Sequence, residues 1–279
     1  MKNLRNKTAV ITGAASGIGR SLAIELAREG CHLALADLNP AGLEDSAANA
    51  AAFGTKVTAR CFDVSDRTAV YSFAEESLRA HGEAHLVVNN AGVELVATID
   101  EIDYTDFEWV MNINFWGMVY GTKAFLPHLK THESHVVNIS SMFGLCAIPM
   151  QSAYSCSKFA IRAFSEALGQ ELSGSMVRVS SVHPGGIRTA ILEQARIKSE
   201  EPIAGDEKRL RRRFTRFALT SPDRAARTII AGIKKNKRRI LVGPDAYAFD
   251  LIQRLFPAGY QHILPFLLSC VKNNPRNAG

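Results

Sequence analysis

Tyr154 and Lys158 stand in a Tyr-x-x-x-Lys spacing, which places both side chains on one face of a helix. A free tyrosine has a pKa near about 10, too high for a base at neutral pH, and a nearby ammonium lowers that pKa. The pair is therefore a candidate proton-transfer device. The hydroxyl of Ser141 is a candidate partner for a substrate oxygen. A Tyr-x-x-x-Lys spacing also occurs by chance on helices that face solvent. The prediction of a catalytic pair therefore needs support from residues elsewhere in the chain.

A glycine-rich turn near the N-terminus supplies such residues. The apolar run 7–12 predicts a buried strand, and it leads directly into the sequence Gly-Ala-Ala-Ser-Gly-Ile-Gly at 13–19. The apolar spacing that follows predicts a helix that stops at Gly30. Strand, glycine turn and helix N-terminus together favour pyrophosphate binding, because backbone amides and the positive helix end face the ligand. An ordinary tight turn is the alternative interpretation.

Asp37 ends a second apolar strand, 32–36, and favours NAD as the dinucleotide. An acidic residue about 20 positions after the glycine turn accepts hydrogen bonds from ribose hydroxyls and repels a 2′-phosphate. The next position is Leu38, not a lysine or an arginine, and Ser16 precedes the second glycine. Both features also favour NAD. Arg20 keeps NADP open as the alternative, and a helix-capping role is the alternative for Asp37.

Further motifs stand in the order typical of one enzyme family. They are Thr12-Gly13-x-x-x-Gly17-x-Gly19, Asp63-Val64, Asn89-Asn90-Ala91-Gly92, Asn114, Ser141, Tyr154-x-x-x-Lys158 and Pro184-Gly185. On these motifs the chain resembles the short-chain dehydrogenase/reductase family from about residue 5 to about residue 243. Each motif alone could be a turn or a solvated helix face, but together they would require several independent coincidences.

The resemblance implies a dinucleotide site and a catalytic set. The implied cofactor-binding residues are Gly13, Ser16, Gly17, Ile18, Gly19, Asp37, Asp63, Val64, Asn90, Ala91, Gly92, Tyr154, Lys158, Pro184, Gly185, Ile187 and Thr189. Tyr154 would exchange a proton with the substrate oxygen during hydride transfer, and Ser141 would hydrogen-bond that oxygen. Lys158 would lower the tyrosine pKa and hold the nicotinamide ribose, and Asn114 would anchor a proton-relaying water.

The alternation of apolar strands with amphipathic helices predicts an α/β fold of the Rossmann type, a doubly wound parallel sheet with helices on both faces. Seven strands are expected near 7–12, 31–36, 56–61, 85–89, 134–139, 176–182 and 238–242. A chain of 279 residues with 47% hydrophobic composition can bury one large core. We therefore expect a single domain, with 1–245 as its dinucleotide-binding and catalytic part and 246–279 as an apolar helical extension.

The cysteines and charges limit the other function classes. Five cysteines show no metal-ligand spacing, so we expect no metal site, and their odd count is typical of reduced thiols in a cytoplasmic protein. The net charge is +6, and basic residues gather at 208–216 and 234–239. Such runs can bind nucleic acid or anionic membranes, but a solvated helix face or the steering of an anionic substrate also explains them. We expect no nucleic-acid partner.

The two ends of the chain differ in character. The N-terminus leads straight into the first predicted strand, so no signal peptide is expected, and no apolar run approaches the roughly 20 residues that span a bilayer. Three interpretations of 246–279 stay open: packing on the core or on another subunit, a lid over an apolar pocket, or contact with a membrane surface. By resemblance, helices near 102–129 and 152–173 pair between subunits in a homodimer or homotetramer.

The sequence thus predicts an NAD-dependent oxidoreductase that transfers a hydride between the nicotinamide and a hydrophobic secondary alcohol or ketone. The apolar walls expected for its pocket are Phe143, Leu145, Ile148, Met150 and Ile191. They suit a steroid, a fatty or aromatic alcohol, or a terpenoid alike. The alternatives are an NADP-linked carbonyl reductase and a non-catalytic nucleotide-sensing protein on the same fold.

Overall fold

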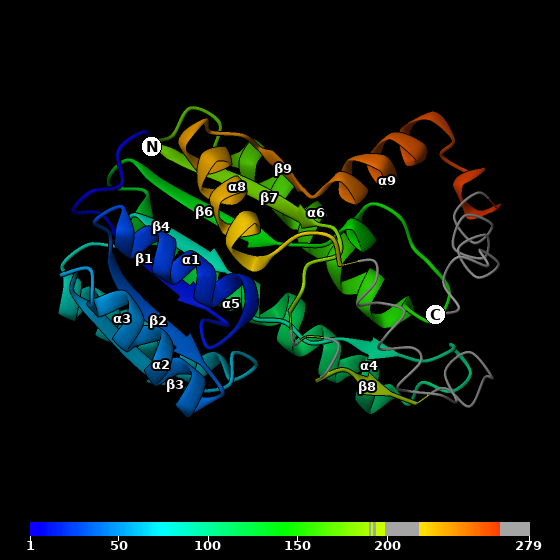
Figure 1. The fold of residues 1–279 in the computed structure, drawn as a ribbon, viewed down its shortest axis with the longest axis horizontal. Helices are drawn as coiled ribbons and strands as arrows, with labels where there is room; N and C mark the ends of the chain where they lie inside the picture. The colour runs from blue at the N-terminus through cyan, green and yellow to red at the C-terminus, as the bar shows by residue number, and fades with distance from the viewer. Residues whose placement is uncertain (190, 192–193, 199–217, 263–279) are drawn as a thin grey trace, which may run out of the picture.

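The structure, a computed structural model, describes residues 1–189, 191, 194–198 and 218–262. Its centre is a seven-stranded sheet in the order β3-β2-β1-β4-β6-β7-β9, with every pairing parallel (Figure 1). The strands are β1 Thr8–Thr12, β2 His32–Asp37, β3 Val57–Cys61, β4 Leu86–Asn89, β6 Ser134–Ile139, β7 Val177–Pro184 and β9 Arg239–Val242. The predicted seven-stranded parallel sheet is confirmed.

Helices cover both faces of this sheet. The helices of the described chain are α1 Gly17–Arg28, α2 Pro40–Ala51, α3 Arg67–His81, α4 Tyr104–Met111, α5 Gly117–Leu129, α6 Ser152–Glu171, α8 Pro222–Lys234 and α9 Pro244–Leu255. α1 packs between α2 and α8 on one face, whereas α3 and α6 accompany α5 on the other. α9 extends away from the sheet towards the end of the described chain (Figure 1).

Alternating strand residues build the two halves of the core. In β1, Ala9 and Ile11 belong to the cluster under α1 and α8, whereas Val10 belongs to the cluster under α3 and α5. In β2, Leu33 and Ala34 divide in the same way. Side chains alternate between the faces of a strand, so a parallel strand buried on both faces is apolar throughout. This explains why the strands were recognisable as continuous apolar runs.

The predicted helix over 102–129 is divided in the structure. α4 and α5 are joined by a π-helical turn, Asn112–Trp116. Such turns are rare and are frequent at functional sites. A second departure is a small parallel pair, β5 Leu95–Val96 with β8 Arg196–Ile197, which stands outside the main sheet. In the described part of the chain, no helix is long and apolar enough to cross a membrane.

The strand order reverses direction between two neighbours, β1 and β4. From β1 the chain proceeds outward through β2 and β3, and from β4 it proceeds the other way through β6 and β7. The connections leave the carboxyl ends of β1 and β4 on opposite faces, which opens a crevice between them. Ligands of doubly wound sheets bind in such a crevice.

Candidate active site

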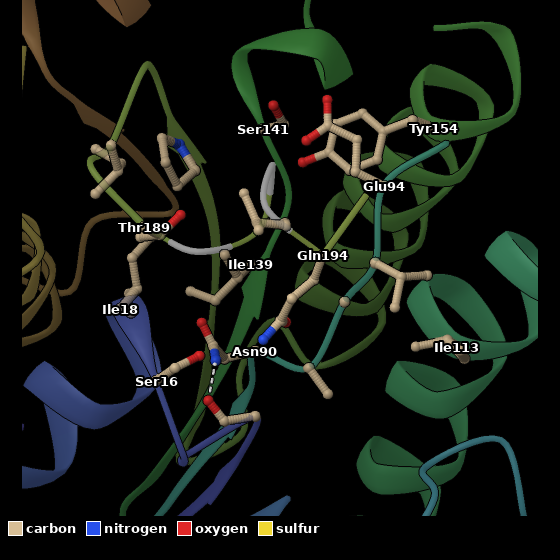
Figure 2. Close-up of a pocket in the computed structure, with 18 of the residues that line it drawn as sticks. Ser16, Ile18, Asn90, Glu94, Ile113, Ile139, Ser141, Tyr154, Thr189 and Gln194 are labelled. Carbon is tan, nitrogen blue, oxygen red and sulfur yellow. Dashed lines mark hydrogen bonds between the residues drawn. The ribbon is translucent and has the colours of Figure 1, made fainter. Parts of the chain in front are cut away.

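A cavity of about 560 Å³ lies at the carboxyl ends of the central strands and brings most of the predicted site together. All the predicted cofactor-binding residues line it except Gly19. Of the four predicted catalytic residues, Ser141, Tyr154 and Lys158 lie on its wall. Figure 2 shows side chains from opposite ends of the sequence, Ser16 and Thr189 among them, facing the same space. The cavity therefore contains both the predicted dinucleotide-binding residues and a reactive end, formed by Ser141, Tyr154 and Lys158.

The glycine turn after β1 has the close packing that a pyrophosphate site requires. Gly13 has a φ of +68°, and a side-chain carbon there would lie 2.7 Å from Asn90 Nδ2. A side-chain carbon on Gly19 would collide with the carbonyl oxygen of Gly13, so Gly19 acts by packing rather than by lining the cavity. Ser16 precedes α1 without capping it, which leaves the first amides of the helix available to an anion. These residues fit the diphosphate of a dinucleotide.

Asp37 ends β2 with its carboxylate on the cavity wall. The backbone amides of Ala15 and Asn39 donate to its two oxygens, each at 2.9 Å. These two bonds orient the carboxylate and leave other lone pairs for ribose hydroxyls. Arg20 does not line the cavity, and its guanidinium lies 3.7 Å from the carboxylate of Asp45. The arrangement suits an unphosphorylated ribose.

The loop after β4 is held against the glycine turn. Asn90 Nδ2 donates to the carbonyl oxygens of Thr12 and Gly13, each at 3.0 Å. The Thr12 hydroxyl accepts from the amides of Asn90 and Ala91. Asn90 thus works as a brace between the two loops that flank the crevice. Asp63 is positioned by a local bond from the Ser65 amide at 2.8 Å.

The loop after β7 closes the other side of the crevice. The carboxylate of Asp245 accepts from the Gly186 amide and packs against Gly185, where a side-chain carbon would collide with it. Further along, Thr189 lies so close to Gly17 that a side-chain carbon on that glycine would be 3.0 Å away. Asp245 is therefore a positioning residue for this loop, and no motif in the sequence points to it.

Ser141 occupies the start of a 3₁₀ turn, Met142–Gly144, that follows β6. Its hydroxyl accepts from the Phe143 amide at 3.1 Å. Its carbonyl oxygen lies 3.0 Å from His183 Nδ1, which must donate because a carbonyl oxygen only accepts. The Nε2 of that imidazole then accepts from the Ser181 hydroxyl, and burial lowers the pKa of His183 to about 4, so the ring is neutral. His183 thereby fixes the backbone of Ser141.

Tyr154 and Lys158 lie on one face of α6, as their spacing predicts, and both are buried. Burial and then the negative charge of Glu94 raise the pKa of Tyr154 above its ordinary value, while a hydrogen bond with Ser141 lowers it. Burial lowers the pKa of Lys158 to about 8. The net pKa shift of Tyr154 is thus upward, and the lowering of this pKa by Lys158 that the spacing suggests stays a prediction. The ammonium lies 5.4 Å from the ring centroid, and burial dominates.

Lys158 and Asn114 meet the loop after β4 at Gly92. The Lys158 ammonium donates to the Ile139 carbonyl at 3.2 Å. A side-chain carbon on Gly92 would lie 3.1 Å from Asn114 Oδ1 and 3.3 Å from Lys158 Nζ. Asn114 itself does not line the cavity. Its amide accepts from Val93 N at 2.8 Å and donates to Val93 O at 3.0 Å, so it clamps the cavity wall.

The comparisons with known proteins agree with this geometry. A family model described as short chain dehydrogenase matches residues 7–200. The chain belongs to the short-chain dehydrogenase/reductase family. A Mycobacterium tuberculosis protein named "Putative oxidoreductase SadH" is 42% identical over 268 residues, which cover 95% of this chain and 96% of that protein. Rat estradiol 17-beta-dehydrogenase 11 is 30% identical over 267 residues, covering 94% of this chain and 84% of that protein.

A solved structure from the same family supports the fold. A short-chain dehydrogenase/reductase from Burkholderia phymatum, in complex with NAD, superposes with a TM-score of 0.86 at 28% identity. The match covers 94% of this chain and 97% of that chain. The single-domain Rossmann-type sheet predicted from the sequence is thus the fold of a short-chain dehydrogenase/reductase.

Beyond the family motifs, the structure adds a carboxylate that the sequence analysis missed. Glu94 follows the Asn-Asn-Ala-Gly motif, lines the cavity and is buried. The Gln151 amide nitrogen donates to it at 3.0 Å. Burial raises the pKa of Glu94 to about 7, while the bond from Gln151 and the charge of Lys158 oppose the rise. The two partners are far apart in the sequence, so no local spacing could have indicated them.

The apolar wall is only partly the predicted one. Phe143 and Ile191 line the cavity as expected, together with Met142. Leu145 and Ile148 are placed elsewhere, because both pack in a cluster with Tyr260. Met150 packs against Val96 and Ile197, and none of these three predicted wall residues reaches the cavity. They were named from hydrophobicity, which does not distinguish the wall of a cavity from a satellite core.

The beginning of the C-terminal extension packs on the core. The Phe249 ring lies 6.4 Å from the ring of Phe143, and the Tyr260 hydroxyl accepts from the Ala147 amide at 3.4 Å. These contacts support the first of the three interpretations for 246–262. Residues 263–279 and the basic run 208–216 lie outside the described residues. In the second basic run, 234–239, the Lys234 ammonium lies 2.5 Å from a carboxylate oxygen of Glu29. Such an ion pair is typical of a solvated helix face.

Proposed function

We propose that this oxidoreductase transfers a hydride between NAD and a hydrophobic secondary alcohol or ketone, with Tyr154 as the general acid/base. The observation that carries the proposal is the single cavity that holds both the predicted dinucleotide residues and Ser141, Tyr154 and Lys158. Its apolar walls favour a hydrophobic substrate. Two relatives are named for such chemistry, one for estradiol and the other, FabG of Thermotoga maritima, for a 3-oxoacyl group.

The residues of the chain divide the work as follows. When bound, NAD would accept the hydride from the carbon of the alcohol, and NADH would donate a hydride to the carbon of the ketone. Tyr154 exchanges the proton of the substrate oxygen, and Ser141 holds that oxygen by a hydrogen bond. Tyr154 would donate this proton as a phenol during ketone reduction and accept it as a phenolate during alcohol oxidation. Lys158 holds the nicotinamide ribose, and Asn114 positions the wall beside it.

NAD is proposed in preference to NADP because of Asp37. Its oriented carboxylate would accept from both ribose hydroxyls and repel a 2′-phosphate, whereas Arg20 lies off the cavity wall. The Burkholderia relative was solved with NAD. An NADP-linked reductase is the alternative. We also propose a cytoplasmic homodimer or homotetramer, with 246–279 as an extension of the same domain, on the family resemblance.

The test is formation of the reduced cofactor with NAD and with NADP over a panel of hydrophobic secondary alcohols. We expect NAD-dependent turnover that Tyr154→Phe abolishes while NAD binding stays nearly intact. Full activity of Tyr154→Phe would refute the assigned role. Cofactor binding without turnover of any alcohol or matching ketone would favour a nucleotide-sensing protein instead.

A further inference from the structure

Glu94 places a carboxylate at the reactive end of the cavity. Its side chain is only 5% exposed and lines the same space as Ser141 and Tyr154. Figure 2 shows the carboxylate of Glu94 and the hydroxyls of Ser141 and Tyr154 gathered in one part of the cavity. The negative charge of Glu94 also contributes to the raised pKa of Tyr154. The proposed hydride transfer uses Ser141 and Tyr154 but leaves Glu94 without a role.

The backbone around Glu94 holds the carboxylate in this position. Asn114 binds both polar groups of Val93, the preceding residue. The carbonyl oxygen of Glu94 accepts from the Arg196 amide at 3.1 Å, at the start of the β5–β8 pair. These bonds fix the backbone that carries Glu94, and the hydrogen bond from Gln151 orients its carboxylate.

The carboxylate has unused acceptor capacity. An ionised carboxylate offers about four acceptor sites, and buried polar groups are normally satisfied. Within the described residues, Gln151 supplies one hydrogen bond, and no lysine, arginine or histidine forms an ion pair with Glu94. The same part of the cavity also carries the hydroxyls of Ser141 and Tyr154, which the proposed hydride transfer directs to the reacting oxygen of the substrate. The side of the carboxyl group that faces the cavity is therefore available to a hydroxyl group of a molecule bound there.

We propose that Glu94 determines specificity by accepting a hydrogen bond from a hydroxyl group of the substrate. The preferred substrates are then diols and hydroxyketones whose second hydroxyl lies near the reacting carbon, on otherwise apolar skeletons. This inference rests on the proposed alcohol–ketone chemistry. A site built to pair with a hydroxyl strongly rejects the analogue that lacks it, because a buried polar group is then left unpaired.

The test compares octan-2-one with 3-hydroxyoctan-2-one, which adds only the hydroxyl. We expect the wild-type enzyme with NADH to prefer the hydroxyketone in kcat/KM by about tenfold to a hundredfold. Glu94→Gln should lose most of this preference: its amide oxygen accepts from Gln151, and the NH2 group that then faces the cavity can only donate to the hydroxyl oxygen, in a weaker neutral hydrogen bond. Glu94→Asp keeps the carboxylate and should retain part of the preference. Glu108→Gln, on the exposed face of α4, is the matched control and should behave as wild type.

Two results would overturn the proposal: equal kcat/KM for both ketones in the wild type, or an unchanged preference in Glu94→Gln. A purely structural role would lower both kcat/KM values together. Binding of octane-2,3-diol to the enzyme with NADH, measured by calorimetry, needs no turnover. Tighter binding by about tenfold in the wild type than in Glu94→Gln supports the proposal even if hydride transfer fails, and equal binding refutes it. Failure of the alcohol–ketone chemistry itself would appear separately, as binding without turnover.

Discussion

The reactive end of the cavity contains three titratable side chains that burial drives towards their uncharged forms. The pKa of Tyr154 is raised, that of Glu94 is raised to about 7, and that of Lys158 is lowered to about 8. Glu94 and Lys158 partly offset each other, since each favours the charged form of the other. The proton balance of the site is therefore shared among three groups rather than set by the tyrosine–lysine pair alone.

Glu94 should make the stability of the fold depend on pH in a defined window. Its pKa is about 7 in the folded protein against 4.5 for the free group, so the folded state holds the proton more tightly. Stability attributable to Glu94 is fully present below about pH 4.5 and is lost as the pH rises to 7. The total loss is roughly 3 kcal/mol.

Glu94→Gln should therefore be more stable than the wild type at pH 8 but not at pH 4.5. The measurement is urea unfolding of both proteins across this range, with Glu108→Gln as the exposed control. A constant difference in the free energy of unfolding between wild type and Glu94→Gln would contradict the prediction. The expected curve converges at low pH because a protonated carboxyl and an amide are both neutral.

At the level of elements, the sequence predicted what local patterns encode. The central strands β1, β2 and β4 were recovered because each is an apolar run that ends in a turn, and the motifs were recovered because several of them sit at the ends of strands. The π-helical turn at 112–116 was missed because no local pattern distinguishes it from an α-helix; within it Asn114 binds Val93, which is distant in the sequence. Glu94 and Asp245 were missed for the same reason, since their partners come from other parts of the chain.

The β5–β8 pair is a separate element that depends on charge. Asp106 is buried on α4 and pairs with Arg196 at 2.8 Å and also with Lys198. These bonds hold the pKa of Asp106 below its usual range, chiefly through the bond from Lys198. Arg196 also stacks over the Trp109 ring at 3.7 Å. The pair thus anchors the stretch of backbone that carries Glu94.

Asp106→Asn should loosen this element without unfolding the main sheet. Losing a charged hydrogen-bond partner should raise the exchange rates of the Arg196 and Lys198 amides at least about tenfold. Those amides donate to Glu94 and Val96, and hydrogen exchange resolved to this segment measures the change. Asp103→Asn is the matched control: Asp103 is exposed, and among the described residues its ion-pair partner is Lys198, so its loss should change little. Equal effects of the two substitutions would contradict the anchoring role of Asp106.

At the scale of the whole molecule, the dinucleotide crevice depends on loops from most of the sheet. Residues after β1, β2, β4 and β7 line one cavity at the point where the strand order reverses. The braces between these loops, such as Asn90 on the glycine turn and Asp245 on the loop after β7, are long-range contacts. The crevice therefore forms only when the whole domain is folded. A ligand that binds there should stabilise the folded state of the whole domain.

NAD should consequently raise the unfolding temperature of the protein. At a concentration of about 100 times Kd, binding adds roughly 2.7 kcal/mol, which corresponds to a rise of roughly 5–10 °C for a domain of this size. Tyr154→Phe should show the same rise, because the phenol acts on the substrate rather than on the diphosphate. NADP at equal concentration should give a smaller rise, and Asp37→Ser should narrow the gap, because the repulsion of the 2′-phosphate is removed. A larger rise with NADP than with NAD in the wild type would reverse the proposed cofactor, while a rise with neither would mean that the crevice, although assembled, does not bind a nicotinamide dinucleotide.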